Sequence, residues 1–139
     1  MTAALVLDAS VALAWCFADE ATTATWEVLG RLDTEGAIAP SPLPLEIANV
    51  LALAERRKRI SASRVAEFVD LIDTLAIEID GQTSVRALHD VLNLARGEAL
   101  TAYDGSYLEL AMRLGLPLAS KDVALRRAAV RLGVPLLGA

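Results

Sequence analysis

Four acidic residues stand at positions where an α/β protein gathers its reacting groups. Each one ends a predicted strand or lies near the start of a predicted helix: Asp8, Glu46, Asp104 and Asp122. In an open parallel sheet, ligands bind where the carboxyl ends of the strands open between helix N-termini. If the fold brings these four side chains to one edge of the sheet, they form an acidic site.

A cluster of carboxylates needs protons or cations, because each like-charged pair about 4 Å apart costs on the order of 4 kcal/mol at an effective dielectric constant of 20. Carboxylate oxygens favour Mg²⁺ or Mn²⁺, and Mg²⁺ usually meets its substrate through phosphate oxygens. One or two such ions lower the pKa of a bound water and neutralise charge on the leaving oxygen of a phosphodiester. The predicted chemistry is therefore metal-dependent hydrolysis.

For each acid taken alone, helix capping is an alternative explanation. Acidic side chains at these positions accept backbone N–H groups and complement the helix dipole. Capping is the more common role of any single one of them, so the catalytic hypothesis depends on the whole set meeting in space.

Short apolar runs alternate along the chain with stretches of helical periodicity. Strands are predicted at residues 4–8, 37–39, 77–79, 116–119 and 134–137, and helices at 11–17, 22–32, 45–59, 61–76, 85–96, 100–114 and 125–132. This alternation predicts an α/β fold with three layers, α/β/α, around a small central parallel sheet of about four to five strands. The strand that carries Asp8 is expected at the centre of the sheet, and residues 1–139 are expected to form one domain.

Several local signals place the ends and faces of these elements. Ser10 is expected to cap the first helix, and Trp26 and Leu29 are expected to face the core. The prolines within residues 40–44 predict a loop that leads into the helix carrying Glu46. Gly97 is expected to end the helix predicted at residues 85–96.

The composition favours a cytoplasmic protein. Cys16 is the only cysteine, so no intrachain disulfide can form. The apolar run at the N-terminus has no basic region before it and is interrupted by Asp8, which argues against a signal peptide and against a membrane span. A mean hydropathy of +0.45 is high for a soluble domain and predicts self-association.

The net charge of −5 argues at first against a nucleic-acid partner, but the charge is unevenly distributed. Residues 1–55 carry 8 acidic residues and one basic residue, whereas residues 56–139 carry 10 acidic and 12 basic residues. One uninterrupted basic run is Arg56, Arg57, Lys58 and Arg59. This run has two interpretations. It contacts the RNA backbone, or it forms the tip of a helical hairpin that is either solvated or bound to a partner protein. Lys121 adjoins Asp122 and is the better-placed candidate for RNA binding.

Four stretches of the chain together resemble the motifs of PIN-domain ribonucleases. They are Leu7-Asp8-Ala9-Ser10, residues 44–50 with Glu46 and Asn49, residues 101–111 with Asp104, and Leu118-Ala119-Ser120-Lys121-Asp122. The resemblance runs from end to end in the order of the family. The third stretch and the total length most resemble the toxin subunits of VapBC-type toxin–antitoxin pairs. Gly105 stands where alanine is usual in the family, and Ser120 stands where threonine is frequent.

The resemblance implies a PIN-like fold and an endoribonuclease toxin that hydrolyses RNA phosphodiester bonds with a metal-activated water. The implied catalytic ligands of Mg²⁺ or Mn²⁺ are Asp8, Glu46, Asp104 and Asp122, and the implied supporting residues are Ser10, Asn49 and Ser120. Substrates of the family are single-stranded or looped RNA. The implied partners are a second copy of the chain, forming a homodimer, and a VapB-type antitoxin.

Two other functions stay open on the sequence. A receiver-like signalling domain also gathers acids around Mg²⁺ at strand ends, but the proline loop before Glu46 breaks the regular alternation that such a domain needs. A PIN-fold module that binds RNA without cleaving it has no need of all four acids. His89 is the only histidine, so little supports a histidine-activated nucleophile.

Overall fold

Five parallel strands form one sheet within residues 3–139, the part of the chain that the computed structural model describes. They are β1 (Val6–Leu7), β2 (Ala37–Ala39), β3 (Ile77–Ile79), β4 (Leu118–Ala119) and β5 (Leu136–Leu137), arranged in the order β3-β2-β1-β4-β5. Val6 pairs with Ile38 of β2 on one side and with Leu118 of β4 on the other. The predicted parallel sheet and the central position of the strand before Asp8 are confirmed.

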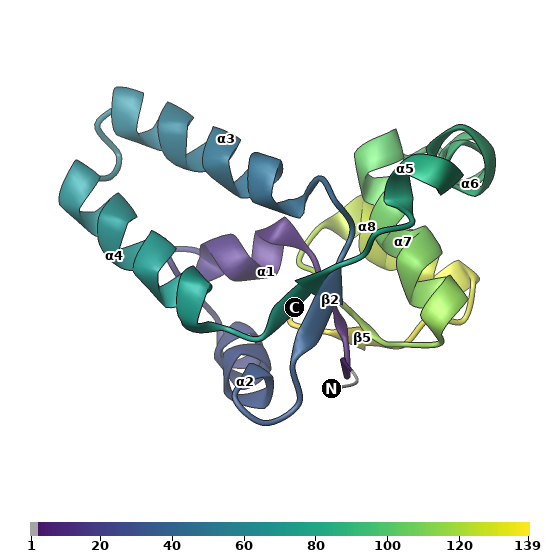
Figure 1. Cartoon of the computed structure of the whole chain (residues 1–139), viewed down its shortest axis with the longest axis horizontal. Helices are drawn as coiled ribbons and strands as arrows, with labels where there is room; N and C mark the ends of the chain where they lie inside the picture. Colours follow the sequence, from purple (N-terminus) through teal and green to yellow (C-terminus); the bar gives the residue numbers. More distant parts are fainter. Residues whose placement is uncertain (1–2) are drawn as a thin grey trace.

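Helices cover both faces of this sheet (Figure 1). The first group comprises α1 (Ala9–Ala14), α2 (Thr23–Leu32), α3 (Leu43–Arg56) and α4 (Ala62–Thr74). The second group comprises α5 (Thr83–Arg86), the π-helical turn η1 (Ala87–Val91), α6 (Leu92–Glu98), α7 (Ala102–Leu114) and α8 (Val123–Arg131). The two groups lie on opposite sides of the sheet in Figure 1, which gives the predicted α/β/α layers.

The core lies between the sheet and these two helical layers. Leu5, Leu7 and Leu118 are completely buried, and so are Phe68 of α4 and Leu108 of α7. Short, continuous apolar strands suit a parallel sheet whose faces are both covered by helices, because neither face meets water. Complete burial of each such side chain contributes about 1.5–3 kcal/mol relative to exposure.

The helix starts follow from local sequence. The hydroxyl oxygens of Thr22, Ser61 and Thr101 each accept a hydrogen bond from a backbone N–H three residues later, which caps α2, α4 and α7. The first turn of α3 contains Pro44. Proline lacks a backbone N–H, but the N–H groups of a first helical turn have no partner within the helix, so no hydrogen bond is lost. The proline loop therefore ends in a helix whose first turn carries Glu46.

Ser10 and Trp26 do not take their predicted places. Ser10 lies inside α1, and Asp8 occupies the N-cap position without a side-chain capping bond. The prediction for Trp26 is wrong, because 48% of its surface is exposed. Thr25 and Val28 take the core-facing positions of α2 instead.

The helix predicted at residues 85–96 is also more complex than its apolar spacing indicates. It consists of α5, η1 and α6, and the wider π-helical turn shifts the register of side chains along it. It continues past Gly97 and ends at Glu98, and the C-cap residue Ala99 has a φ of 55°, in the left-handed region. The predicted stop at Gly97 is therefore wrong.

Several large apolar side chains remain on the surface. Leu45, Val85 and Leu88 are 75%, 67% and 78% exposed, respectively. Within residues 3–139, the helices are too short or too polar for any of them to cross a membrane.

Candidate active site

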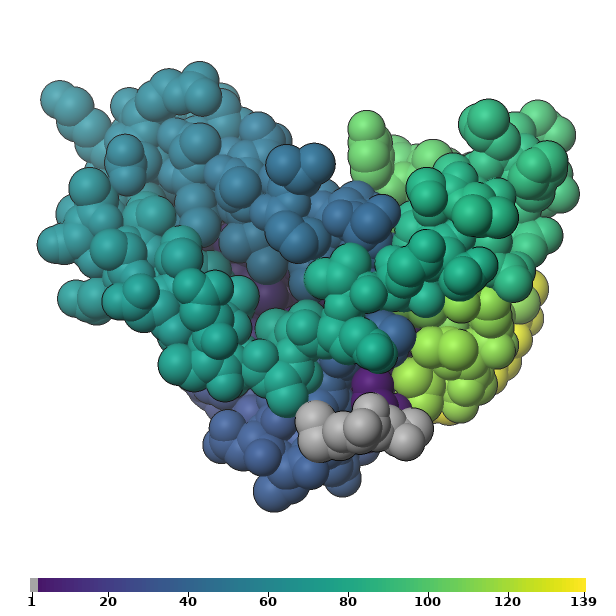
Figure 2. Space-filling model, viewed as in Figure 1, coloured from purple at the N-terminus to yellow at the C-terminus, as the bar shows by residue number. Residues whose placement is uncertain are grey.

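The four acids come from segments that end at one edge of the sheet. Asp8 directly follows β1, Asp122 follows β4, and Glu46 lies in the first turn of α3 after β2. Because β1, β2 and β4 are adjacent and parallel, their carboxyl ends lie together. Asp104 lies in the first turn of α7, the helix that precedes β4 and returns the chain to the start of that strand. In Figure 2 the molecular surface is notched between α3 and the α5–α7 segment.

Asp8 is the most buried of the four, with 4% of its surface exposed. Its Oδ2 accepts hydrogen bonds from the hydroxyls of Ser10, at 2.6 Å, and Ser120, at 2.8 Å. The Ser10 Oγ also accepts from the backbone N–H of Lys121, and the Ser120 Oγ accepts from the backbone N–H of Asp122. These bonds hold the turn after β1 against the turn after β4, so two of the acids are fixed relative to each other.

Glu46 is half-buried and has a partner on another helix. The hydroxyl of Tyr107, on α7, donates to Glu46 Oε1 at 2.7 Å. This bond joins two residues that are 61 positions apart in the sequence. Helical spacing indicates only that Tyr107 faces the core, and no local signal pairs it with Glu46, so sequence reasoning missed this contact.

One of the four acids caps a helix. Asp122 occupies the N-cap of α8, and its Oδ2 accepts from the backbone N–H of Leu125 at 2.8 Å. Asp8 makes no side-chain capping bond, and in α7 the cap is Thr101 rather than Asp104. The ordinary structural role therefore accounts for Asp122 but leaves Asp8 and Asp104 without such an explanation.

The acids form one electrostatic unit. Burial raises the pKa of Asp8 and the charge of Asp122 adds to this effect, while hydrogen bonds from the two serines oppose it. Burial also raises the pKa of Glu46, the Tyr107 hydrogen bond lowers it, and the charges of Asp8 and Asp104 raise it further. Burial, followed by the charges of Asp122 and Asp8, raises the pKa of Asp104 from 3.8 to about 6. Each carboxylate therefore interacts with at least two of the other three.

The donor set fits a hard divalent cation. All four side chains offer carboxylate oxygens, and their mutual repulsion is the kind of cost that a cation relieves. Within residues 3–139, no three His, Cys, Asp or Glu side chains already have the close spacing of a metal cage. Among the described residues, the side-chain hydrogen bond of Glu46 is made by Oε1, which leaves its second oxygen able to bind an ion.

The remaining predicted site residues are spread more widely. Asn49 is exposed one turn along α3 from Glu46. Arg56 lies in the last turn of α3, about 15 Å along the helix axis from Glu46 at a rise of 1.5 Å per residue. Arg57 and Lys58 follow it at the exposed tip of the hairpin between α3 and α4.

Two of the predicted RNA-binding residues have protein partners. The Arg59 guanidinium donates to Glu20 Oε2 at 2.7 Å and lies 4.1 Å from the centre of the Phe17 ring. The Lys121 ammonium donates to the backbone oxygen of Glu20. Both residues therefore hold the loop between α1 and α2, and the opposite charge beside Arg59 reduces its attraction for phosphate.

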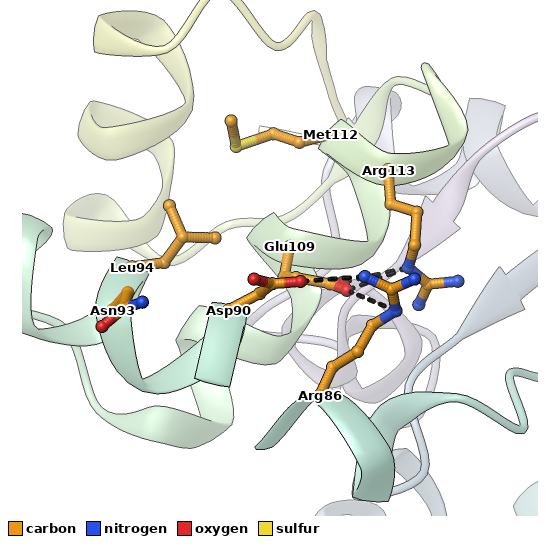
Figure 3. Close-up of a pocket in the computed structure, with 7 residues that line it drawn as sticks. All are labelled: Arg86, Asp90, Asn93, Leu94, Glu109, Met112 and Arg113. Atoms are coloured by element: carbon orange, nitrogen blue, oxygen red, sulfur yellow. Dashed lines mark hydrogen bonds and ion pairs between the residues drawn. The ribbon is translucent and has the colours of Figure 1, made fainter. Parts of the chain in front are cut away.

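A pocket of about 500 Å³ opens elsewhere, between the α5–α6 segment and α7 (Figure 3). It is lined by Arg86, Asp90, Asn93, Leu94, Glu109, Met112 and Arg113. Glu109 is buried, accepts from Arg113 Nε at 2.9 Å and lies 3.6 Å from Arg86 Nε. Arg113 also donates to Asp80 Oδ2 at 2.7 Å. These charges neutralise one another and tie the end of β3 and α5 to α7, the helix that carries Asp104.

Comparison with known families identifies the fold. The sequence matches the family model of the PIN domain over residues 5–131. The chain belongs to the PIN-domain family. Comparison of this PIN domain with curated proteins gives no match, whereas 21 chains of solved structures resemble it. One is the crystal structure of PAE2754 from Pyrobaculum aerophilum, at 20% sequence identity and a TM-score of 0.69, covering 96% of this chain and 83% of that one. At this identity the likeness concerns the fold.

Membership of the family sets the general class of activity. PIN domains are generally metal-dependent nucleases, which agrees with a site built from carboxylates. The sheet also excludes the receiver-like alternative. Receiver domains have the strand order 2-1-3-4-5, whereas the strands of this PIN domain follow the order 3-2-1-4-5.

The pKa of Asp104 gives the metal-free PIN domain a specific pH dependence. A carboxyl whose pKa rises on folding binds its proton more tightly in the folded state, so its contribution to stability is lost as the pH rises from the unfolded value of 3.8 through about 6. In EDTA, we expect Asp104→Asn to gain stability relative to the wild type as the pH rises from 3.8 to about 6, and the gain to level off at higher pH. Urea unfolding of both proteins at several pH values measures this difference. A stability difference that does not change with pH contradicts the raised pKa of Asp104 in the folded protein.

Proposed function

We propose that this PIN domain is a metal-dependent endoribonuclease that acts in the cytoplasm as the toxin of a VapBC-type toxin–antitoxin pair. The observation that carries the proposal is the placement of Asp8, Glu46, Asp104 and Asp122 at one edge of the sheet, where burial and neighbouring negative charge raise the pKa of the first three. Four carboxylates from separate segments that gather at one edge of the sheet repel one another and need a cation, and family membership supports nuclease chemistry at such a site.

The side chains of this site have different tasks in the proposed mechanism. Asp8, Glu46, Asp104 and Asp122 would hold Mg²⁺ or Mn²⁺ through their free oxygens. When bound, the ion supplies a water of lowered pKa and positive charge beside the leaving oxygen. Ser10 and Ser120 hold Oδ2 of Asp8 in place, and the burial of Asp8 keeps bulk water away from that oxygen. The RNA phosphodiester breaks by hydrolysis and leaves two ends, one of which keeps the phosphate.

The RNA is expected to approach from the exposed side of this edge. Asn49 lies on this side of α3, one turn from Glu46, and we assign it to positioning the substrate or a water. Among the basic candidates, Arg56, Arg57 and Lys58 are exposed at the far end of the same helix, whereas Arg59 is paired with Glu20. A strand of RNA that follows α3 would meet the acids first and this basic tip several nucleotides later. The contacts to the tip would add affinity but no sequence preference.

The toxin assignment rests on the resemblance of the motifs and on the surface. A toxin of this type has two protein partners, a second copy and a VapB-type antitoxin, and each one covers apolar surface. Leu45, Val85 and Leu88 are exposed near the start of α3 and along α5 and η1, and they offer such surface. The high mean hydropathy of +0.45 points in the same direction.

Cleavage of single-stranded RNA by the purified protein tests the proposed activity. We expect cleavage with Mg²⁺ or Mn²⁺, loss of cleavage in EDTA, and recovery when the ion is restored. A single-stranded DNA of the same sequence serves as the comparison substrate. RNA that is bound but left intact under all metal conditions would identify the non-cleaving RNA-binding module instead.

The toxin role has its own test. Induced expression of the chain in a bacterial host is expected to arrest growth, and co-expression of a small antitoxin-like protein from the reading frame immediately upstream is expected to restore it. Mapping the new RNA ends after induction identifies the target. If growth continues although the expressed protein cleaves RNA, the toxin assignment is wrong and the nuclease assignment stands.

A further inference from the structure

Tyr107 has a buried hydroxyl group with no role in the proposed mechanism. Its side chain is completely buried, and its hydroxyl donates to Glu46 Oε1 at 2.7 Å. It lies three residues after Asp104 on α7, and residues at this spacing share one face of a helix. The same face of α7 therefore carries one acid of the site and the hydrogen-bond partner of another.

Glu46 has the longest side chain of the four acids, and its hydrogen-bond partner lies on another helix. Asp8 is held by two serine hydroxyls, and Asp122 is held by the backbone at the start of α8. Glu46 has a longer and more flexible side chain and is only half-buried, and Tyr107 supplies its hydrogen bond. Ordering a free glutamate side chain costs conformational entropy, because several rotatable bonds become fixed. A partner that fixes the carboxylate before the ion arrives removes part of this cost from ion binding.

We propose that Tyr107 is a positioning residue, which holds Oε1 of Glu46 so that the second oxygen is presented to the divalent cation. The proposal rests on the function proposed above, because it assigns Glu46 to the ion. The opposite explanation is that Glu46 merely satisfies a buried tyrosine hydroxyl. The two explanations differ in whether loss of the hydroxyl changes ion binding through Glu46.

Mn²⁺ binding to the purified protein distinguishes these explanations, with the free ion followed by electron paramagnetic resonance. Removing a group that orients a metal ligand typically weakens metal affinity about 10-fold or more. We therefore expect Tyr107→Phe to raise the Kd for Mn²⁺ by about 10-fold. Tyr103→Phe is the matched control, because Tyr103 is on the same helix, is 63% exposed, and loses the same atom. This control is expected to bind Mn²⁺ as the wild type does.

A double-mutant cycle with Glu46→Gln tests whether the effect passes through Glu46. We expect Tyr107→Phe to change the Kd for Mn²⁺ in the wild-type background and to leave it nearly unchanged in the Glu46→Gln background. Equal factors in both backgrounds would mean that the hydroxyl acts through packing of α7, and this result would overturn the proposal. Urea unfolding of each variant identifies the solution conditions under which every protein is folded. Mn²⁺ binding is then measured only under those conditions.

Two further outcomes separate this inference from the proposed function. If the wild type binds Mn²⁺ and cleaves RNA but Tyr107→Phe binds Mn²⁺ equally well, the positioning role is wrong and the nuclease assignment stands. If the folded wild type binds no Mn²⁺, both fail together. A parallel loss of metal affinity and of kcat/KM in Tyr107→Phe, regained in part at saturating Mn²⁺, supports the positioning role.

Discussion

Asp8→Asn is expected to lower kcat/KM for RNA cleavage by about 10³-fold while the protein keeps its fold. In the proposed mechanism, the metal contributes several kcal/mol of transition-state stabilisation. A loss of about 4 kcal/mol corresponds to a factor of 10³ in rate. Asparagine has nearly the shape of aspartate, and its side-chain oxygen can still accept from Ser10 and Ser120. What it lacks is the negative charge that a cation requires. The turns after β1 and β4 should therefore stay in place around a site that no longer binds its ion.

The stability of this variant provides an independent check. Burial raises the pKa of Asp8, so ionised Asp8 destabilises the metal-free protein at neutral pH. In EDTA at pH 7, Asp8→Asn should be at least as stable to urea as the wild type, and added Mg²⁺ should stabilise only the wild type. Asp33→Asn, at the exposed end of α2, is the matched control and should retain both activity and the response to Mg²⁺. An undiminished cleavage rate in purified Asp8→Asn would rule out the mechanism.

Arg113→Met is expected to lower the free energy of unfolding by about 3 kcal/mol, since removal of one partner from a buried ion pair typically costs 3–5 kcal/mol. Arg113 pairs with Asp80 at 2.7 Å and with Glu109 at 2.9 Å, and the side chains of these acids are only 10% and 7% exposed. Methionine keeps much of the volume of arginine but leaves Asp80 without its countercharge and Glu109 with Arg86 alone, 3.6 Å away. Urea denaturation at pH 7 measures the loss.

Arg31→Met is the control for this prediction. Arg31 and Glu35 have the same spacing of four residues as Arg113 and Glu109, but their side chains are 39% and 44% exposed. An exposed ion pair contributes about 0–1 kcal/mol, so its loss should change stability little. Replacing Glu109 with glutamine in the Arg113→Met background should recover part of the lost stability. Equal effects of Arg113→Met and Arg31→Met would show that burial does not strengthen the network in Figure 3.

The general architecture was accessible from the sequence because its signals are local and repeated. The apolar run before Asp8 has no polar alternation, which is typical of a parallel strand covered on both faces. Ser61 three residues before Arg64, with an amphipathic stretch beyond it, predicts the start of α4 correctly. The π-helical turn η1 was not accessible, because a single wider turn disturbs the apolar spacing no more than ordinary sequence variation does.

The site divides in a similar way. The positions of Asp8 after a strand and of Glu46 after the proline loop are readable along the chain, because they depend on neighbouring residues. The hydrogen bond between Tyr107 and Glu46 depends on how α3 and α7 sit across the sheet, so it has no local signature. The same limit applies to Arg59 and Lys121, whose charges indicate a ligand, whereas their contacts in the structure are with the loop that contains Glu20.

The central position of β1 also determines when the acidic edge is assembled during translation. In the sheet, β1 is flanked by β2, which is made soon after it, and by β4, which is made after β3 and all of the helices from α1 to α7. A nascent chain that has reached residue 100 carries Asp8 and Glu46 but neither Asp104 nor Asp122. One side of β1 is then still open, and half of the carboxylates do not yet exist. The acidic edge is therefore complete only after α7 and the turn that follows β4 have been made.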